Sequence, residues 1–242
     1  MREITVASYN IQHGVGLDFR QDIGRTVRVL CDVGADVIAL QEVVVAPDGG
    51  RADQAQFIAS SLGMNLVMGI TRPHGRGSFG NAILTRLPVS HVERCDLSVR
   101  GREPRLCLRA DVALEGRTLS IYCAHFGLGP GERRRQLDRL RTFLRASHAR
   151  RGSRVLMGDF NELHRGPITR TLWREFTTLE PRQVRSHPAL APLLSLDRIY
   201  WDAELSGDGP RAHRTKWSRL ASDHLPLVAK LRVETRSVCL AP

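Results

Sequence analysis

The chain has little lysine and few aromatic residues. Lys216 and Lys230 are the only lysines, although lysine and arginine together number 36, so arginine carries almost all of the positive charge. Aromatic residues make up 5% of the 242 positions, which leaves few stacking platforms for the bases of single-stranded nucleic acid. This scarcity argues against a single-strand nuclease.

Closely spaced cysteines are also missing. The five cysteines are widely separated and include no Cys-x-x-Cys pair, which argues against a disulfide framework and against a cysteine zinc site. Cys31, Cys107 and Cys123 stand inside apolar runs, where a free cysteine acts as a small core residue. Cys123, two residues before His125 and on the same face of a predicted strand, is the one candidate for a cysteine nucleophile.

No apolar run approaches the ~18 residues that a membrane-spanning helix requires. The start, Met1–Val6, enters a strand pattern without the apolar stretch and cleavage site of a secretory signal. We therefore expect a soluble, cytoplasmic protein. The hydrophobic fraction is 42% and no Pro/Gly/Ser-rich linker divides the chain, so we expect residues 1–242 to form a single domain, and that domain to be a monomer.

The formal net charge is +11 at pH 7. A basic balance favours nucleic acid, anionic lipid or small anionic substrates, and the fork of arginine matches two phosphate oxygens. A bias toward arginine across a whole proteome would give the same composition, so the charge only supports a function argued on other grounds.

Short apolar runs, many of them continuous, predict strands that are buried on both faces. We expect strands at Ile4–Ile11, Val37–Gln41, Asn65–Ile70, Asn81–Thr85, Leu106–Leu114, Thr118–His125, Val155–Gly158, Leu196–Trp201 and Leu225–Val233, with a hairpin turn at Glu115-Gly116. Helical periodicity predicts helices at Arg20–Val33, Asp53–Leu62 and Glu132–Arg150. This mixture predicts an α/β fold, a four-layer α/β/β/α sandwich with two packed mixed β-sheets.

Polar side chains cluster at the ends of these apolar strands. They are Asn10, Glu42, His125, Asp159 with Asn161, Asp197, and Asp223 with His224. Each alone has a plain structural explanation, such as an Asx turn or a cap. Because a core accepts such groups only where they are paired, hydrogen-bonded or bound to a metal, the set together predicts a pocket.

These segments resemble the endonuclease/exonuclease/phosphatase superfamily, which has the deoxyribonuclease-like fold. The resemblance rests on Tyr9-Asn10-Ile11, Leu40-Gln41-Glu42-Val43, Gly80-Asn81-Ala82-Ile83-Leu84, Ala124-His125, Gly158-Asp159-Phe160-Asn161, Leu196-Asp197-Arg198-Ile199 and Ser222-Asp223-His224-Leu225-Pro226, in the family's order over nearly the whole chain. It implies a divalent-metal-dependent hydrolase of phosphate esters.

The resemblance also implies a role for each residue. Glu42 would be the principal ligand of Mg²⁺ or Mn²⁺, with Asn10 and Asp223 beside it. Asp159 would orient or deprotonate the attacking water, and Asn161 would hold Asp159 or donate to a phosphate oxygen. His224 would pair with Asp197, and His125 would be a second donor to the phosphate or the leaving oxygen. Asn81 and Arg105 would bind the substrate, with Arg105 either reaching a phosphate or only pairing with surface acids.

Departures from the family leave three points open. Many DNA-repair members carry an acidic residue where this chain has Gln12, so either the metal has one carboxylate fewer or His13 helps to hold it. The segment Thr71–Phe79 contains no acidic residue to orient His125. Its glycine-rich, basic part, Thr71–Ser78, is either a phosphate-binding loop or a plain flexible loop. Arg185-Ser186-His187-Pro188 lines the pocket rim or forms an ordinary surface loop.

The most favoured function is a phosphodiesterase acting on DNA, a phospholipid headgroup or a small phosphorylated metabolite. A phosphomonoesterase is the alternative within the same class. A non-catalytic basic protein that binds nucleic acid or acidic lipid is the alternative from another class.

Overall fold

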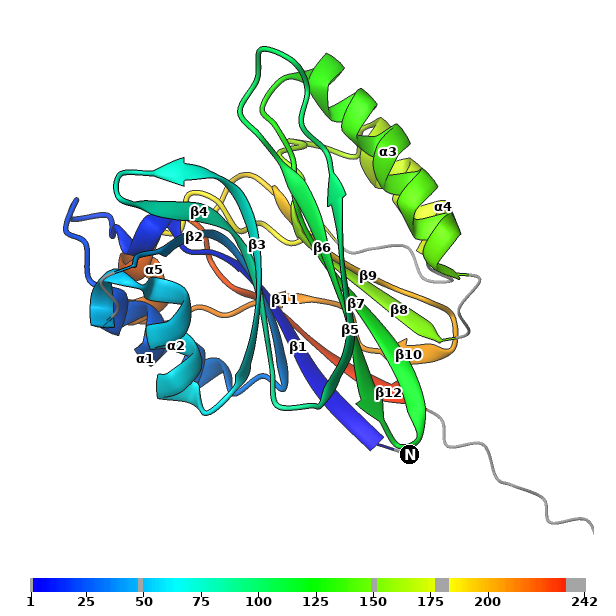
Figure 1. Cartoon of the computed structure of the whole chain (residues 1–242), viewed down its shortest axis with the longest axis horizontal. Helices are drawn as coiled ribbons and strands as arrows, with labels where there is room; N and C mark the ends of the chain where they lie inside the picture. Colours follow the sequence, from blue (N-terminus) through cyan, green and yellow to red (C-terminus); the bar gives the residue numbers. More distant parts are fainter. Residues whose placement is uncertain (1, 48–49, 149–151, 177–182, 234–242) are drawn as a thin grey trace, which may run out of the picture.

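The computed structural model describes residues 2–47, 50–148, 152–176 and 183–233, and in this part of the chain two β-sheets pack face to face with helices on their outer faces (Figure 1). The first sheet runs β10 (Leu205–Gly207), β12 (Leu227–Val233), β1 (Arg2–Asn10), β2 (Val37–Val45), β4 (Gly77–Thr85) and β3 (Asn65–His74), with β11 (Arg211–Ala212) paired to β12. The second sheet runs β5 (Val89–Asp96), β6 (Leu106–Leu114), β7 (Arg117–His125), β8 (Ser153–Asp159) and β9 (Asp197–Trp201).

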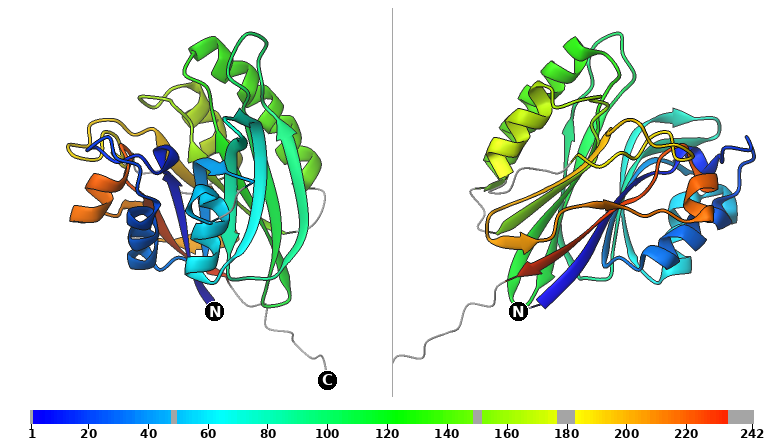
Figure 2. Two further views of the ribbon diagram at one scale, coloured as in Figure 1. Left: turned by 60° about the vertical axis from the view of Figure 1, so that its left-hand side comes forward. Right: turned by 180° about the vertical axis from the view of Figure 1, so that it is seen from behind.

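Each sheet is mixed, as the sequence predicts. β1 and β2 are parallel in the first sheet, β7 and β8 are parallel in the second, and the other paired strands are antiparallel. The outer face of the first sheet carries α1 (Ile23–Val33), α2 (Gln54–Leu62) and α5 (Lys216–Ala221), and that of the second carries α3 (Pro130–His148) and α4 (Pro167–Phe176). Short 3₁₀ turns lie at Gln12–Gly14 and Gly50–Ala52. Figure 2 shows the two helical layers on opposite sides of the sheets, which confirms the predicted four-layer sandwich.

The layers exist because the central strands are apolar on both faces. In β7, Ile121 and Cys123 face the core between the sheets, whereas Tyr122 and Ala124 face α3 and α4. In β1, Val6 faces the inter-sheet core and Ala7 faces the helices on the other side. Successive side chains of a strand point to opposite faces, so a continuous apolar run serves two cores at once.

Several predicted boundaries are corrected. α1 begins at Ile23, because the side chain of Asp22 accepts a hydrogen bond from the Gly24 amide and caps the helix there. α3 begins at Pro130, and the last two residues predicted for it, Ala149 and Arg150, lie outside the described residues. The turn at Glu115-Gly116 is confirmed, with both residues at positive φ.

The sequence missed β5, β10, β11, α4 and α5. β5 alternates half-buried and exposed residues at the edge of its sheet, so its apolar content is low. The glycine-rich Thr71–Ser78 segment is a β-hairpin joining β3 to β4 through Gly75-Arg76, so the alternative of a plain flexible loop is wrong, whereas phosphate binding there stays a prediction. Cys31 is exposed, which contradicts the core role expected for it, whereas Cys107 and Cys123 are buried. None of the described helices is long and apolar enough to cross a membrane.

Candidate active site

The register of the central strands brings the predicted site residues to one end of the sandwich. His125 at the end of β7 pairs with Asp159 at the end of β8, and Asp159 pairs on its other side with Asp197 at the start of β9. In the facing sheet, Asn10 ends β1 beside Gln41, one residue before Glu42. Residues far apart in the chain therefore meet at the same edge of the two sheets.

Asp159 lies at the centre of this group, and its side chain is almost completely buried. Its Oδ2 atom is 3.2 Å from Nδ2 of Asn10, 3.7 Å from Nε2 of His125 and 3.8 Å from Nε2 of His224. Asn10 belongs to the first sheet and His125 to the second, so this one carboxylate joins the functional edges of both sheets.

The glycine before Asp159 allows this approach. A Cβ atom on Gly158 would lie 1.9 Å from the carbonyl oxygen of Ala124 on β7, and the φ of Gly158 is +154°. Any larger residue would push β8 away from β7 and separate Asp159 from His125. The Gly-Asp-Phe-Asn sequence thus has a geometric requirement at its first position.

Glu42 projects from a bulge in β2. The pairing of β2 with β4 shifts register between Leu40 and Val43, and Glu42 adopts a φ of +61°, which is rare for a residue other than glycine. Its carboxylate lies 2.9 Å from Nε2 of His13 and 3.1 Å from Nδ2 of Asn10. Burial alone would raise the pKa of Glu42, but the contacts with His13, His125 and Asn10 outweigh it and lower that pKa to about 2.

His224 is held between carboxylates. Its Nδ1 atom lies 2.8 Å from Oδ2 of Asp197, and the hydroxyl of Ser186 donates to the same oxygen at 2.5 Å. Burial opposes a charge on the ring, but the attraction of Asp197, Asp159 and Asp223 outweighs it and raises the pKa of His224 to about 10. The imidazolium is therefore the form of His224 at neutral pH.

His125 has the opposite environment. Nη1 of Arg105 lies 2.9 Å from its Nδ1 atom. Because a guanidinium only donates, Nδ1 must accept, and the ring proton is on Nε2, which faces Asp159 and Glu42. Burial and the charge of Arg105 lower the pKa of His125 to about 4. His125 is therefore a neutral donor at neutral pH.

Arg105 is the residue that orients His125. Its side chain is buried, and its second nitrogen donates to Glu103 at 2.7 Å, which in turn accepts from Arg72 at 3.0 Å. The support is therefore a guanidinium held by Glu103, and among the described residues no acidic side chain is hydrogen-bonded to Nδ1. This position behind the histidine differs from the direct substrate contact that the sequence predicts for Arg105.

The two remaining amides lie close to the backbone. Asn161, at a φ of +50°, donates its backbone N–H to Oδ1 of Asp159 at 2.9 Å and its side-chain amide to the carbonyl of Phe126 at 2.8 Å. Asn81 on β4 donates to the carbonyl of Leu106 on β6 at 3.2 Å and so ties the two sheets together. Asn161 thus holds Asp159 through its backbone.

His187 and Ser186 complete the site, although the sequence left their segment open between a pocket rim and an ordinary surface loop. Nε2 of His187 lies 3.6 Å from Oδ2 of Asp223, and its ring centroid is 4.8 Å from that of His224. The peptide bond between His187 and Pro188 is cis. The only signal in the chain was the position of this segment shortly before Asp197.

Two carboxylates suit a divalent cation. The side chains of Glu42 and Asp223 are 23% and 29% exposed, whereas those of Asp159 and Asp197 are almost completely buried. Burial opposes ionisation of Asp223, but His187 and His224 lower its pKa, and the charge of Glu42 acts against them. Two ionised, accessible carboxylates that repel one another fit Mg²⁺ or Mn²⁺, which prefer oxygen ligands and retain water. Among the described residues, two groups place three potential ligand atoms within 4.8 Å of one another. They are His187/Asp223/His224 and Asp159/Asp197/His224, and neither includes Glu42.

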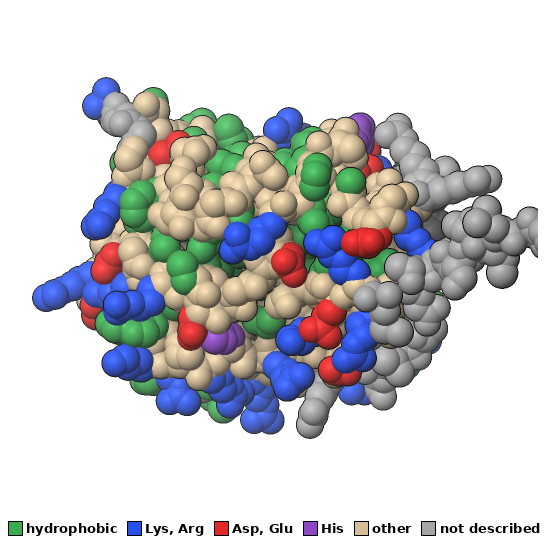
Figure 3. Space-filling view, turned by 90° about the horizontal axis from the view of Figure 1, so that it is seen from below, with side chains coloured by type: hydrophobic (Ala, Val, Ile, Leu, Met, Phe, Trp, Pro, Cys, Tyr) green, Lys and Arg blue, Asp and Glu red, His purple; other side chains and the backbone are tan. Residues whose placement is uncertain are grey.

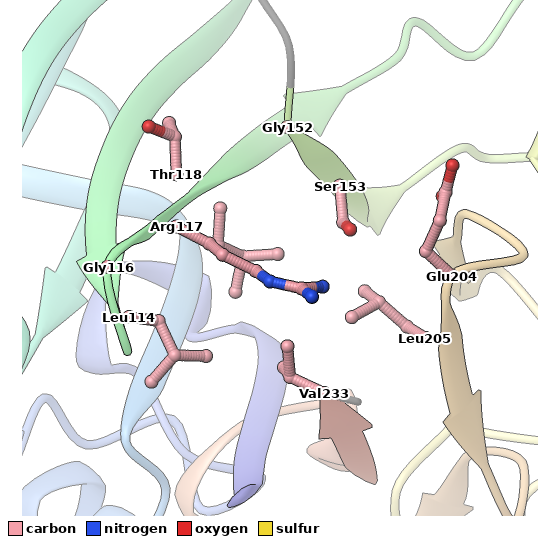
Figure 4. A pocket seen from close by; sticks show the side chains of 10 residues that line it. Leu114, Gly116, Arg117, Thr118, Gly152, Ser153, Glu204, Leu205 and Val233 are labelled. Carbon is pink, nitrogen blue, oxygen red and sulfur yellow. The ribbon is translucent and has the colours of Figure 1, made fainter. Parts of the chain in front are cut away.

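Two other features lie apart from this chemistry. A cavity of about 620 Å³ lies at the start of β7 and β8, and Arg117 reaches into it (Figure 4). At roughly 3.3 Å per strand residue, Arg117 is roughly 26 Å from His125, so this cavity is remote from the site.

Cys123 is fully buried between the sheets, and burial raises the pKa of its thiol to about 12, which contradicts the alternative of a cysteine nucleophile.

Comparison with known proteins agrees with this architecture. A sequence profile described as the Endonuclease/Exonuclease/phosphatase family matches residues 7–224. The protein YbhP of Escherichia coli (strain K12) is 32% identical over 220 residues, which cover 83% of this chain and 85% of YbhP.

Two solved structures share the fold. An endonuclease/exonuclease/phosphatase from Beutenbergia cavernae DSM 12333 superposes with a TM-score of 0.72 at 22% identity, covering 99% of this chain and 74% of that one. The mannosyl-6-phosphatase Bt3783 of Bacteroides thetaiotaomicron VPI-5482 gives a TM-score of 0.73 at 16% identity, covering 95% of this chain and 99% of that one. Because the family profile spans most of its length, the chain belongs to the endonuclease/exonuclease/phosphatase family, whose members are phosphoester hydrolases.

Proposed function

We propose that this protein is a divalent-metal-dependent phosphodiesterase with its catalytic centre at Asp159. The supporting observation is that the Asp159 carboxylate lies within 4 Å of Nε2 of both His125 and His224, in a group that also contains Glu42 and Asn10. The two imidazoles differ in charge, so the same carboxylate faces one cation and one neutral donor.

The proposed role of each residue follows from its protonation state. Asp159 accepts a hydrogen bond from the attacking water and takes its proton, because its carboxylate is aligned by the Asn161 amide and the Asn10 side chain. The His224 cation, fixed by Asp197, stabilises the negative charge that develops on the phosphoryl oxygens. His125 donates from Nε2 to the phosphate or the leaving oxygen.

Glu42, Asp223 and Asn10 are the residues that would hold the cation. Bound there, Mg²⁺ or Mn²⁺ supplies electrophilic polarisation of a phosphoryl oxygen. His13 keeps the Glu42 carboxylate aligned at 2.9 Å, in the neighbourhood where Gln12 replaces the acid of other family members. Asn81 and Arg105 remain proposed as substrate-side residues, with Arg105 acting through His125.

The deciding experiment compares hydrolysis of bis-p-nitrophenyl phosphate and p-nitrophenyl phosphate, with Mg²⁺, with Mn²⁺ and with EDTA. We expect diester hydrolysis that EDTA abolishes, and losses of roughly 10²–10⁴-fold in Glu42→Ala and Asp159→Asn. Faster cleavage of the monoester would favour a phosphomonoesterase. Equal, metal-independent rates of hydrolysis in the wild type and both variants would favour the alternative that the protein is a non-catalytic basic binding protein.

A further inference from the structure

Large apolar side chains are exposed on loops around the mouth of the candidate site. Phe19 is 92% exposed, Leu128 74%, and Leu190 and Leu193 67% each. These loops follow His13, His125 and His187 in the chain, and Leu163, at 50%, follows Asn161. Single exposed apolar residues are ordinary on a protein surface, but their gathering at the active-site end indicates contact with something apolar.

Phe19 is the strongest of these observations. It stands at the tip of a small turn, closed by hydrogen bonds from the Gly16 amide to the Arg20 carbonyl at 3.0 Å and from the Phe19 amide to the Gly16 carbonyl at 2.9 Å. Its φ is +58°, a conformation that bulky residues rarely adopt. A strained backbone that places a whole phenyl ring in water does not stabilise the fold, so a role outside the fold explains it better.

An apolar cleft of about 530 Å³ lies beside this turn. It is lined by the apolar side chains of Leu17, Leu190 and Leu220 together with Asp18, Lys216 and Arg219. The cleft adjoins the site, because the Ala189 amide donates to the Asp223 carbonyl at 2.7 Å, one residue before Leu190. An apolar floor next to two cations suits a molecule that carries hydrocarbon beside a phosphate.

The same end of the molecule carries cations that have no acidic partner in the described part of the chain. Among the described residues, no ion pair involves the exposed side chains of Arg20, Arg76, Arg102, Arg185, Lys216 and Arg219. The exposed acids nearby are already occupied, since Asp18 pairs with Arg25 and Glu103 with Arg72 and Arg105. On the opposite end, by contrast, acidic side chains stand between the basic ones (Figure 3).

We propose that this rim docks on the surface of an anionic phospholipid bilayer, and that the ester cleaved is the phosphate ester of a phospholipid lying in that surface. A bilayer interface accepts both inserted apolar side chains and surface cations. Duplex DNA presents phosphates that arginine can bind, but it offers little apolar surface on which the exposed leucines of several loops could pack. In the reaction, water's oxygen bonds to phosphorus, the phosphorus–oxygen bond to the alcohol breaks, and the alcohol leaves with a proton.

The docking is measured by co-sedimentation of the full chain with phosphatidylcholine vesicles, with and without phosphatidylglycerol. The variants are Phe19→Gly, Leu190→Ser and their combination, and Val92→Ser on β5 is the control, because Val92 is 38% exposed and lies away from the mouth. We expect the wild type and Val92→Ser to bind the anionic vesicles. The double variant should bind at least about tenfold more weakly, because two apolar contacts are lost. Phe19→Gly relieves the positive φ and should unfold at no lower temperature than the wild type.

Three results would overturn the inference. They are no binding of the wild type to anionic vesicles, equal binding by the double variant, or a loss in that variant of binding to a DNA duplex instead. The inference rests on the proposed function for the chemistry, so hydrolysis of soluble bis-p-nitrophenyl phosphate is measured in parallel. Soluble hydrolysis without vesicle binding rejects the docking and keeps the function. Vesicle binding without hydrolysis of either the soluble diester or the vesicle phospholipid supports the docking and rejects the function.

Discussion

Two histidines that face the same carboxylate have different charges because the residues behind them differ. Asp197 stands behind His224, and Arg105 stands behind His125. The pKa of His224 is raised to about 10 and that of His125 is lowered to about 4. Across neutral pH the site therefore holds one fixed cation and one neutral donor, and each state can be tested by changing the residue behind the ring.

Asp197→Asn should change the pH dependence of hydrolysis as well as its rate. In the wild type, His224 keeps its proton as pH rises through neutrality and loses it near its raised pKa of about 10. Without the Asp197 carboxylate the pKa of His224 falls, so activity should decline with rising pH already near neutrality, with a deficit of up to roughly 10²-fold on the alkaline side. The measurement is kcat/KM against pH, and profiles of the same shape in both proteins would contradict the charge assigned to His224.

Arg105→Met should lower activity by acting on His125. Without the guanidinium donor, the His125 proton is free to move to Nδ1, so the Nε2–H donor is lost in part of the molecules. We expect a loss of up to roughly 10²-fold in kcat. Nitrogen-15 NMR of His125 should show a mixture of tautomers, a change that a merely structural defect would not produce. Arg100→Met, an exposed arginine in the same connection between β5 and β6, is the control, and an unchanged His125 spectrum in Arg105→Met would refute the role.

At the scale of elements, the irregular positions of strands and turns are where the chemistry lies. Glu42, Asn161, Gln12 and His13 all have positive φ, and all are within or beside the site. In β2 the bulge directs Glu42 out of the regular alternation, toward Asn10 and His13. Such strained residues persist only when the surrounding structure holds them. The cost of their backbone conformation to stability and the contribution of their side chains to activity can therefore be measured separately.

The variants Glu42→Gly and Glu42→Ala should distinguish the stability cost of the backbone at residue 42 from the activity of its carboxylate. Both remove the carboxylate, so both should lose hydrolytic activity. Glycine adopts a φ of +61° without strain and alanine does not, so Glu42→Gly should be more stable than Glu42→Ala by about 1 kcal/mol. Urea denaturation measures this difference. If the alanine variant is equally stable or more stable, the bulge does not hold residue 42 in the left-handed conformation in solution.

For the whole molecule, the cation should stabilise the fold as well as serve the chemistry. Glu42 on β2 and Asp223 before β12 are brought together only by the assembled first sheet, and their charges repel. Mg²⁺ or Mn²⁺ should therefore raise the unfolding temperature above that in EDTA, with a gain of about 2.7 kcal/mol at a hundredfold excess over Kd. Glu42→Ala should lose most of this shift in differential scanning calorimetry. An equal shift in both proteins would mean that the ion binds elsewhere.

Much of the fold was predictable because its signals are local. The continuous apolar runs of β1, β2, β7 and β8 are dictated by cores on both faces, and the polar residues that follow these strands have no place in either core. α5 was missed because it has only six residues, and β5 because it is an edge strand with weak apolar content. α4 is as long as the predicted α2, and the helical spacing of its buried Ile168, Leu172 and Phe176 was a signal that was overlooked.

By itself the sequence determined the two-sheet sandwich, the strand ends at which polar groups collect, and the identity of Asp159, His224 and Glu42 as the residues to test. Only the tertiary structure decided which groups touch. It placed Arg105 behind His125, His13 against Glu42, and His187 beside Asp223. The physical reason is that strand periodicity is a property of neighbouring residues, whereas a hydrogen bond between residues 20 or more positions apart depends on loop paths and sheet register that no local pattern encodes.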